Sequence, residues 1–286
     1  MTQNNLPALE QLKISSRYLR GTLAESLADP TSGSINDDDN KLLKFHGSYM
    51  QDDRDIRDER RKQKLEPDYR LMVRARIPGG VVTSQQWLDL DDLARKYASS
   101  GLRITTRQTF QWHGIRKEHL RKLMSGVAAT GLSTLAACGD VVRNLVSSVN
   151  PELSSAHAEV YEWTYKLMEH LEPKTTAYQE LWLDQLAETT DGSQDQEPLL
   201  GETYLPRKFK IGVAIPPYND IDVFSQDFGL IAIIENEELV GFNLVPGGGM
   251  GASFGNDKTY PQLGDLIGYV PKEHLLETLW HGVAVQ

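Results

Sequence analysis

The sequence predicts an α+β protein in three parts. Residues 71–130 show strand, helix, strand and helix patterns in turn, the order of one half of an α+β sandwich. A capped helix pattern begins at Asn150, and three strand patterns follow from Phe209, as expected of a mixed α/β domain. The chain of 286 residues allows one large domain or two ordinary ones, and we expect an extended N-terminal arm, a half-sandwich and a larger domain, with limits at 1–67, 68–135 and 136–286.

The N-terminal part looks like a polar arm. Residues 29–40 are rich in turn-forming residues and predict a loop. Residues 51–64 mix both charge signs, with Asp53 and Arg57 four residues apart, which favours a solvated helix with weak ion pairs.

The half-sandwich follows from four patterns. Leu71–Ile77 is typical of a strand, stopped by the Pro-Gly-Gly at 78–80. Ser84 can cap a helix running to about Ala98. Leu102–His113 is predicted as a second extended segment, and Lys117–Thr130 as a second helix.

The last part is predicted to begin with a helix. Asn150 is a suitable N-cap before Pro151, and the helix should reach about His170. Residues 189–198 predict a polar surface loop. Three strands are then expected, at Phe209–Ile215, Leu230–Ile234 and Leu239–Val245.

Charge and composition exclude several classes of protein. The net charge of −10 argues against general nucleic-acid binding, but residues 152–197 carry nine of those ten negative charges, so a basic patch elsewhere is possible. No apolar run is long enough to span a membrane, and residues 1–11 do not resemble a secretory signal. The single cysteine, Cys138, excludes an internal disulfide and a cluster held by this chain's thiolates alone. We therefore expect a cytoplasmic protein.

Segment 102–113 carries an unusual polar face. Its even positions are mostly apolar, whereas its odd positions carry hydrogen-bonding side chains and no carboxylate. Arginine forks match carboxylates in two-point contacts, so this face suits a polyanion. Spacing alone leaves two alternatives, an anion site and a plain solvated face. The odd residues are Arg103, Thr105, Arg107, Thr109, Gln111 and His113.

Other cations show the same period of two. Arg74 and Arg76 form one pair, and Lys208 and Lys210 form another. Arg143 lies inside an apolar run, so a structural ion pair and a bound ligand remain alternative explanations for it.

Common chemical motifs are missing. The glycines at 247–251 fit a loose dinucleotide pattern, but no helix pattern follows, which leaves a flexible turn or a close approach to a flat ligand. No two of the seven histidines have metal-ligand spacing, so we expect no metal site. Cys138 lacks the context of a nucleophile and is expected to be a small buried residue.

Several strings together carry a resemblance that covers about residues 15–270. They include Arg76-x-Pro78-Gly79-Gly80-Val81, Thr106-Arg107-Gln108-Thr109-Phe110-Gln111-x-His113-Gly114, Leu205-Pro206-Arg207-Lys208-Phe209-Lys210 and Asn219-Asp220-Ile221-Asp222. In this order they resemble the N-terminal half of the hemoproteins of assimilatory NADPH-dependent sulfite reductases, in the siroheme-containing nitrite and sulfite reductase family. The resemblance implies a ferredoxin-like half domain followed by a mixed α/β siroheme-reductase domain.

The resemblance also implies a reaction and a site. Members reduce sulfite to sulfide at siroheme, which bears eight carboxylates and is bridged by a cysteine to a four-iron sulfur cluster. Their electrons come from a flavoprotein α subunit, and no nucleic acid or membrane is involved. By motif, the siroheme-binding residues are Arg103, Thr105, Arg107, Gln111, His113 and Arg207. The residues for the substrate anion and its protons are Arg74, Arg143, Lys208 and Lys210, which we expect to share one anion pocket.

The chain departs from that family in length. Family chains are about twice as long, and their second half carries the four cluster cysteines, which this sequence lacks. The resemblance therefore implies that siroheme is shared with a missing C-terminal half, and that this chain alone is not a competent enzyme. The alternative is a truncated, non-catalytic remnant or fragment that binds a partner subunit or siroheme weakly.

Overall fold

The computed structural model describes residues 6–183, 193 and 195–286. The chain divides into two compact units, and each contains one sheet. Unit 1 consists of Met1–Arg76, Val82–Val141 and Pro173–Arg207, and unit 2 of Ile77–Val81, Val142–Glu172 and Lys208–Gln286. Helices and strands occur in both, so the predicted α+β class is confirmed.

The sheet of unit 1 is antiparallel, with the order β1-β2-β4-β3. Its strands are β1 (Ser48–Asp52), β2 (Tyr69–Arg74), β3 (Arg103–Ile104) and β4 (Phe110–Ile115). Beyond β2, Arg76 continues the extended path through a single bridge to Ser133. The Pro-Gly-Gly segment then forms a 3₁₀ turn, η2 (Pro78–Gly80), as its turn residues predict.

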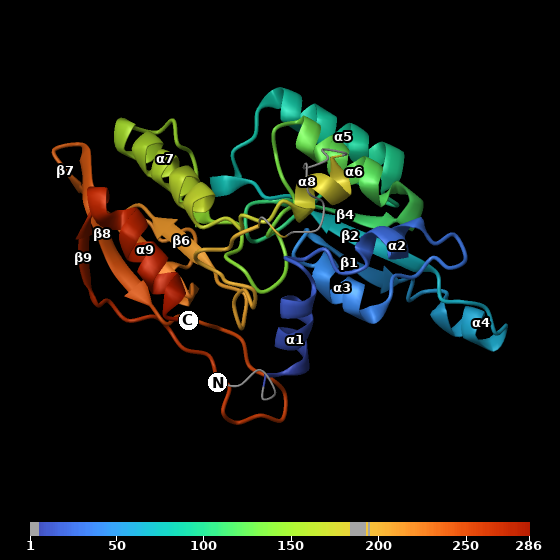
Figure 1. Cartoon of the computed structure of the whole chain (residues 1–286). Helices are drawn as coiled ribbons and strands as arrows, with labels where there is room; N and C mark the ends of the chain where they lie inside the picture. Colours follow the sequence, from blue (N-terminus) through green and yellow to red (C-terminus); the bar gives the residue numbers. More distant parts are fainter. Residues whose placement is uncertain (1–5, 184–192, 194) are drawn as a thin grey trace. The chain divides into compact units, whose positions relative to one another are not determined.

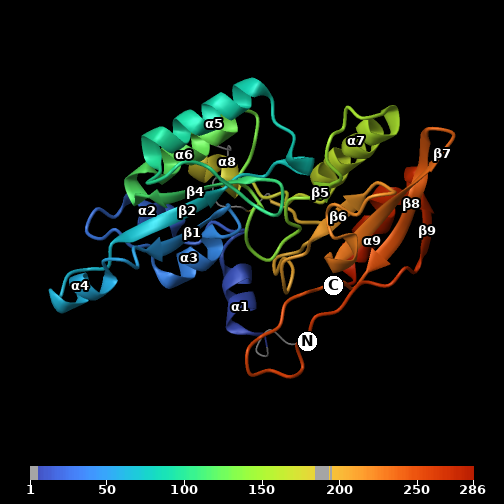
Figure 2. The same cartoon turned by 180° about the vertical axis from the view of Figure 1, so that it is seen from behind.

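Two helices cover one face of this sheet. Helix α5 (Ser84–Tyr97) packs against β4 and α6 (Lys117–Ala129) against β2, and both views show them side by side (Figures 1 and 2). The predicted helices are confirmed, but the N-cap of α5 is Thr83 rather than Ser84. The Thr83 hydroxyl accepts from the Gln86 N–H, and the Gln86 side chain accepts from the Thr83 N–H, which closes a capping box.

The prediction of one extended segment over Leu102–His113 is wrong. The chain turns back between β3 and β4, where the Thr105 N–H donates to the Thr109 carbonyl at 2.9 Å and Gln108 has φ = 50°. Arg103 pairs with Gln111 and Ile104 with Phe110, so odd residues face odd residues. The alternation therefore continues across the turn, and the pattern does not distinguish a hairpin from one long strand.

The N-terminal residues form part of unit 1. They contain α1 (Ala8–Ser15), α2 (Leu23–Ala28), α3 (Asp37–Leu43) and α4 (Arg57–Lys62), and they supply β1. Leu19, Leu23, Leu42 and Leu43 are completely buried, so the segment expected as an extended arm is folded and contributes to the core. Helix α4 buries no residue and is the solvated helix expected there. Its Arg57, however, pairs with Asp52 at 2.5 Å instead of Asp53.

Two acidic residues of the expected surface loop at 189–198 are buried in unit 1. Asp195 is 9% exposed and accepts from Arg20 Nη1 at 2.8 Å. Glu197 is 8% exposed and accepts from the backbone N–H groups of Lys174 and Thr175. The prediction of a surface position is therefore wrong for these two residues. Buried carboxylates need hydrogen-bond donors, and here the donors come from segments that are distant in the sequence. Residues 184–192 and 194 lie outside the described part.

The sheet of unit 2 is mixed, with the order β5-β6-β7-β8-β9. The strands β5 (Val146–Ser147), β6 (Ile211–Ala214) and β7 (Phe228–Glu235) are parallel, whereas β8 (Glu238–Pro246) and β9 (Gly268–Pro271) pair antiparallel. β6, β7 and β8 fall where strands are predicted. Short 3₁₀ turns, η3 (Val223–Ser225) and η4 (Lys272–His274), precede β7 and the last helix.

Helices α7 (Ser155–His170) and α9 (Leu275–Ala284) pack against this sheet and each other, whereas α8 (Ala177–Trp182) belongs to unit 1. The prediction that a helix begins at Asn150 is wrong. Asn150 has φ = 66° and lies in a turn, and Ser154 caps α7 by accepting from the His157 N–H. Asn tolerates both a cap and a left-handed position, so its presence does not decide between them. In the described part of the chain, no helix is both long and apolar enough to cross a membrane.

Candidate cofactor and anion site

Three strands of unit 1 place polar side chains in one row. Arg74 of β2 is in register with Gln111 of β4, which in turn is in register with Arg103 of β3. Residues opposite each other in antiparallel strands point to the same face. His113, two residues beyond Gln111, shares that face. Unit 1 thus brings together four of the predicted site residues.

The guanidinium of Arg74 is held on two sides. Its Nη1 donates to the Ala137 carbonyl at 3.2 Å and to Sγ of Cys138 at 3.0 Å. Its Nε lies 2.8 Å from the Gln111 amide, and Nη2 contacts the same group. The side chain is half-buried. Because all three nitrogens contact neighbours, the direction of the guanidinium is fixed by the fold.

His113 is a neutral group in this row. Burial and the positive charges of Arg103 and Arg74 lower the pKa of His113 below its ordinary value. A neutral imidazole has one N–H donor and one nitrogen acceptor. Its Nε2 lies 2.9 Å from the Gln111 amide.

The other predicted cofactor residues of unit 1 lie in loops. Thr105 and Arg107 form the β3–β4 turn, where the Arg107 N–H donates to the Thr105 hydroxyl at 3.2 Å. Arg207 is exposed and lies outside any strand. Arg103 is also exposed, and among the residues that the structure describes neither Arg103 nor Arg207 forms an ion pair with a carboxylate.

Unit 2 brings together the other three predicted residues. Val142 forms a parallel bridge with Phe209, and the Arg143 N–H donates to the Phe209 carbonyl at 2.8 Å. Lys208 and Lys210 flank Phe209, so three cations lie on two neighbouring extended segments. The Lys210 N–H donates to Asp227 at 2.8 Å, which anchors this segment next to β7. The expected common pocket with Arg74 stays a prediction.

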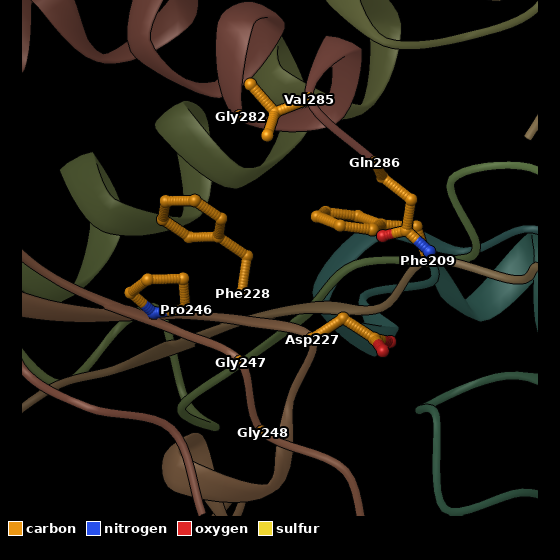
Figure 3. Close-up of a pocket in the computed structure, with 9 residues that line it drawn as sticks. All are labelled: Phe209, Asp227, Phe228, Pro246, Gly247, Gly248, Gly282, Val285 and Gln286. Carbon is orange, nitrogen blue, oxygen red and sulfur yellow. The ribbon is translucent and has the colours of Figure 1, made fainter.

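An apolar pocket of about 400 Å³ lies at the start of β7 in unit 2. Figure 3 shows the rings of Phe209 and Phe228 beside it, with Val285 and Gln286, which follow the end of α9. Gly248 also lines it, and a Cβ there would come within 2.3 Å of two carbonyl oxygens. The described residues directly after the glycine segment, 252–261, form no helix, in agreement with the failed dinucleotide motif. A close backbone packing, rather than a phosphate loop, explains Gly248.

Sequence reasoning missed the contact between Arg74 and Cys138. Cys138 is 3% exposed, which confirms the expected small buried residue, but its sulfur also lies against a predicted substrate residue. Sixty-four residues separate the two. No local pattern reports a contact at that separation.

The side chains present fit a polycarboxylate cofactor better than a metal cluster. Arg74, Arg103 and His113 share a face with Gln111 and offer N–H donors, the groups that bind carboxylates. One cysteine cannot supply the four thiolates of a four-iron cluster. In the described part of the chain, no group of three His, Cys, Asp or Glu side chains is arranged to hold a metal ion.

Two family models identify the class of protein to which this fold belongs. The model of the nitrite/sulfite reductase ferredoxin-like half domain matches residues 62–130, which contain β2, β3, β4 and both covering helices. The model of the nitrite and sulphite reductase 4Fe-4S domain matches residues 162–286. The chain belongs to the nitrite and sulfite reductase family, as its motifs suggest, and thus to a family of oxidoreductases.

Curated relatives have names that specify one kind of reductase. The sulfite reductase [NADPH] hemoprotein beta-component of Shouchella clausii is 55% identical over 287 residues, covering 100% of this chain and 50% of that protein. The beta-component of Staphylococcus haemolyticus is 57% identical, covering 95% of this chain and 47% of that protein. The chain spans about half the length of these curated relatives.

Solved structures agree on the fold. The NirA protein of Mycobacterium tuberculosis superimposes with a TM-score of 0.70 at 21% identity, over 98% of this chain and 46% of that one. Dissimilatory sulfite reductase I superimposes with a TM-score of 0.53 at 11% identity, over 96% of this chain and 80% of that one. At these identities the likeness concerns the fold alone.

Proposed function

We propose that this chain is the siroheme- and sulfite-binding N-terminal half of a sulfite reductase hemoprotein. The observation that carries the proposal is the row Arg74, Gln111 and Arg103 with His113, which presents donors without a carboxylate on one sheet face. The sequence identity of about 55% to hemoprotein beta-components indicates the class of reaction. Hydrogen sulfite would take up six electrons and six protons to give hydrosulfide and three waters.

The residues have separate roles in this proposal. Siroheme, when bound, supplies the electrons to sulfur. Its carboxylates would be bound by the side chains of Arg103, Thr105, Arg107, Gln111, His113 and Arg207. Arginine stays protonated, so Arg74 and Arg143 would bind the sulfite anion, whereas Lys208 and Lys210 could also pass protons to the departing oxygens.

The same proposal limits what the chain does alone. With one cysteine it does not supply the ligands of the four-iron cluster, so we propose that turnover needs the part of the relatives that this chain does not match. The electron donor would be a flavoprotein α subunit, and the compartment the cytoplasm. The domain limits near residues 67 and 135 stay predictions.

A second candidate function is a non-catalytic fragment. The single cysteine, which is too few for a four-iron cluster, favours it. Such a fragment would bind siroheme weakly or would bind a partner subunit.

Reconstitution with siroheme distinguishes the two. The purified chain is mixed with siroheme, freed of excess by gel filtration, and its visible absorption is measured. We expect stoichiometric colour that falls at least tenfold in the double variant Arg103→Ala/Arg107→Ala and is unchanged in Arg95→Ala, on the exposed side of α5. A colourless native chain would favour the fragment.

A further inference from the structure

Gln111 lies between two groups with different hydrogen-bonding needs. On one side is the guanidinium of Arg74, with Nε at 2.8 Å and Nη2 in contact. On the other side is Nε2 of His113 at 2.9 Å. An amide has an oxygen that only accepts and a nitrogen that only donates, so each neighbour must face the matching end.

Arg74 decides which end faces which neighbour. A guanidinium has donors and no acceptor, so the atom that faces it must be the amide oxygen. The amide nitrogen then faces His113 and donates to Nε2. An imidazole nitrogen that accepts a hydrogen bond carries no proton, so the proton of neutral His113 is on Nδ1.

The surroundings of His113 agree with a neutral ring. Burial lowers the pKa of His113 most, and the positive charges of Arg103 on β3 and Arg74 on β2 lower it further. Protonation of Nε2 would bring its N–H donor against the NH₂ donor of Gln111, unless the Gln111 amide rotated by half a turn. That rotation would place the amide NH₂ against the Arg74 guanidinium, which has no acceptor to offer.

Arg74 is fixed from the opposite side as well. Its Nη1 donates to the Ala137 carbonyl and the Cys138 sulfur. With Gln111 on Nε and Nη2, the guanidinium is oriented before any anion arrives. A fixed donor costs less conformational entropy on binding than a free one.

We propose that Gln111 is a positioning residue whose amide orients the Arg74 guanidinium and keeps His113 as the neutral tautomer with its proton on Nδ1. The value of this arrangement for sulfite chemistry rests on the proposed function. Arg74 is there to hold the anion, and His113 Nδ1–H remains available as a donor. The arrangement itself is a property of unit 1 and needs no cofactor.

The tautomer of His113 tests the proposal directly. Two-dimensional NMR of the full chain labelled with ¹⁵N in histidine separates protonated from unprotonated ring nitrogens, and the spectrum of His113→Gln assigns the signal. We expect a protonated Nδ1, an unprotonated Nε2 and a pKa below that of an ordinary histidine. A native chain with its His113 proton on Nε2 would overturn the proposal, and this measurement needs no variant of Gln111.

Two variants test the role of the amide. Gln111→Glu replaces the NH₂ with an oxygen that accepts, so the His113 proton should move to Nε2 and its pKa should rise. Gln111→Leu removes both bonds, so hydrogen exchange at Arg74 Nε–H should accelerate at least tenfold. Gln51→Glu makes the same chemical change at an exposed position of β1 and should change neither signal. Unchanged His113 and Arg74 signals in folded variants of Gln111 would also overturn the proposal.

Failure of the proposed function gives a different result. If the expected tautomer is present but siroheme does not bind, Gln111 still positions Arg74 and His113, and the reaction assigned to the site is wrong. If siroheme binds and the tautomer is the opposite one, the function stands and the inference about Gln111 fails.

Discussion

The indole nitrogen of Trp182 donates a 3.0 Å hydrogen bond to Nδ1 of His46, although 136 residues separate them. The Nε2 of His46 lies 2.9 Å from the Leu19 carbonyl, so it carries the ring proton. Both side chains are completely buried in unit 1. The bond joins the end of α8 to the segment before β1, with a neutral imidazole between them.

The buried imidazole makes unit 1 sensitive to acid. Burial, together with the charge of Arg20, lowers the pKa of His46 to about 4. The unfolded chain, with an ordinary histidine pKa near ~6.5, binds this proton more readily. The contribution of neutral His46 to the free energy of unfolding is therefore fully present above pH ~6.5. About 3 kcal/mol of it is lost as the pH falls from there through 4. Urea unfolding at pH 7 and pH 4.5, monitored by tryptophan fluorescence, measures the loss.

The control for this titration is His46→Asn. It removes the group, so the difference between the two pH values should shrink, although the variant is less stable at both. An equal pH dependence in the native chain and in this variant would assign the acid sensitivity to other groups.

Arg20 should be essential for the stability of unit 1. Its Nε and Nη2 form a two-point bridge with Glu180, and Nη1 donates to Asp195, all in a buried setting. Removing one partner of a buried ion pair costs about 3–5 kcal/mol, because the remaining charges are unpaired. We expect Arg20→Ala to lower the free energy of unfolding by this amount. Arg95→Ala breaks an exposed pair with Asp91 and should change it by less than about 1 kcal/mol.

Gly248 should not tolerate a side chain. A Cβ at this position would lie 2.3 Å from the carbonyl oxygens of Phe224 and Gln226, both backbone atoms. We expect Gly248→Ala to destabilise unit 2 by about 1–3 kcal/mol, the usual cost of overpacking. At Gly251 a Cβ would meet nothing within 4 Å, so Gly251→Ala is the matched control. Equal melting temperatures for the two variants would contradict the prediction.

Exposed apolar side chains predict self-association. Along residues 250–269, which lead into the edge strand β9, seven large apolar or aromatic side chains are at least half exposed. Large apolar patches and open sheet edges promote association and dye binding. We expect light scattering to show oligomers that decrease in a Phe254→Ser/Leu266→Ser variant. A monodisperse native monomer that binds no apolar dye would contradict this. The side chains are Met250, Phe254, Tyr260, Leu263, Leu266, Ile267 and Tyr269.

We expect substitutions of Arg107 and Lys208 to have different effects, the first on cofactor binding and the second on turnover. In a full-length hemoprotein, which also contains the half of the relatives that this chain does not match, Arg107→Ala should lower the siroheme content, because the proposed function assigns Arg107 to a cofactor carboxylate. Lys208→Ala should leave the siroheme absorption nearly unchanged and lower sulfite turnover about 100-fold, the usual value of a positioned proton donor. Absorption and turnover are measured on the same samples. Equal losses of both quantities in the two variants would refute the assignment.

The sequence alone determined the fold class, most elements and the polar face. Helices α5 and α6 were predictable because apolar residues recur at helical spacing, and β7 and β8 because their runs are apolar and bounded by turn residues. The face with Arg103, Gln111 and His113 followed from alternation, since side chains of extended segments alternate between two faces. These are local properties, set by residues near each other in the chain.

Tertiary structure decided what local patterns leave open. The turn at 105–109 preserves the alternation, so only strand pairing shows that Arg103 lies opposite Gln111. The contacts of Arg74 with Cys138 and of Trp182 with His46 join segments distant in sequence. Such pairs form because the burial of a polar group is favourable only when another part of the chain supplies its partner. No short window contains both members, so the fold alone selects them.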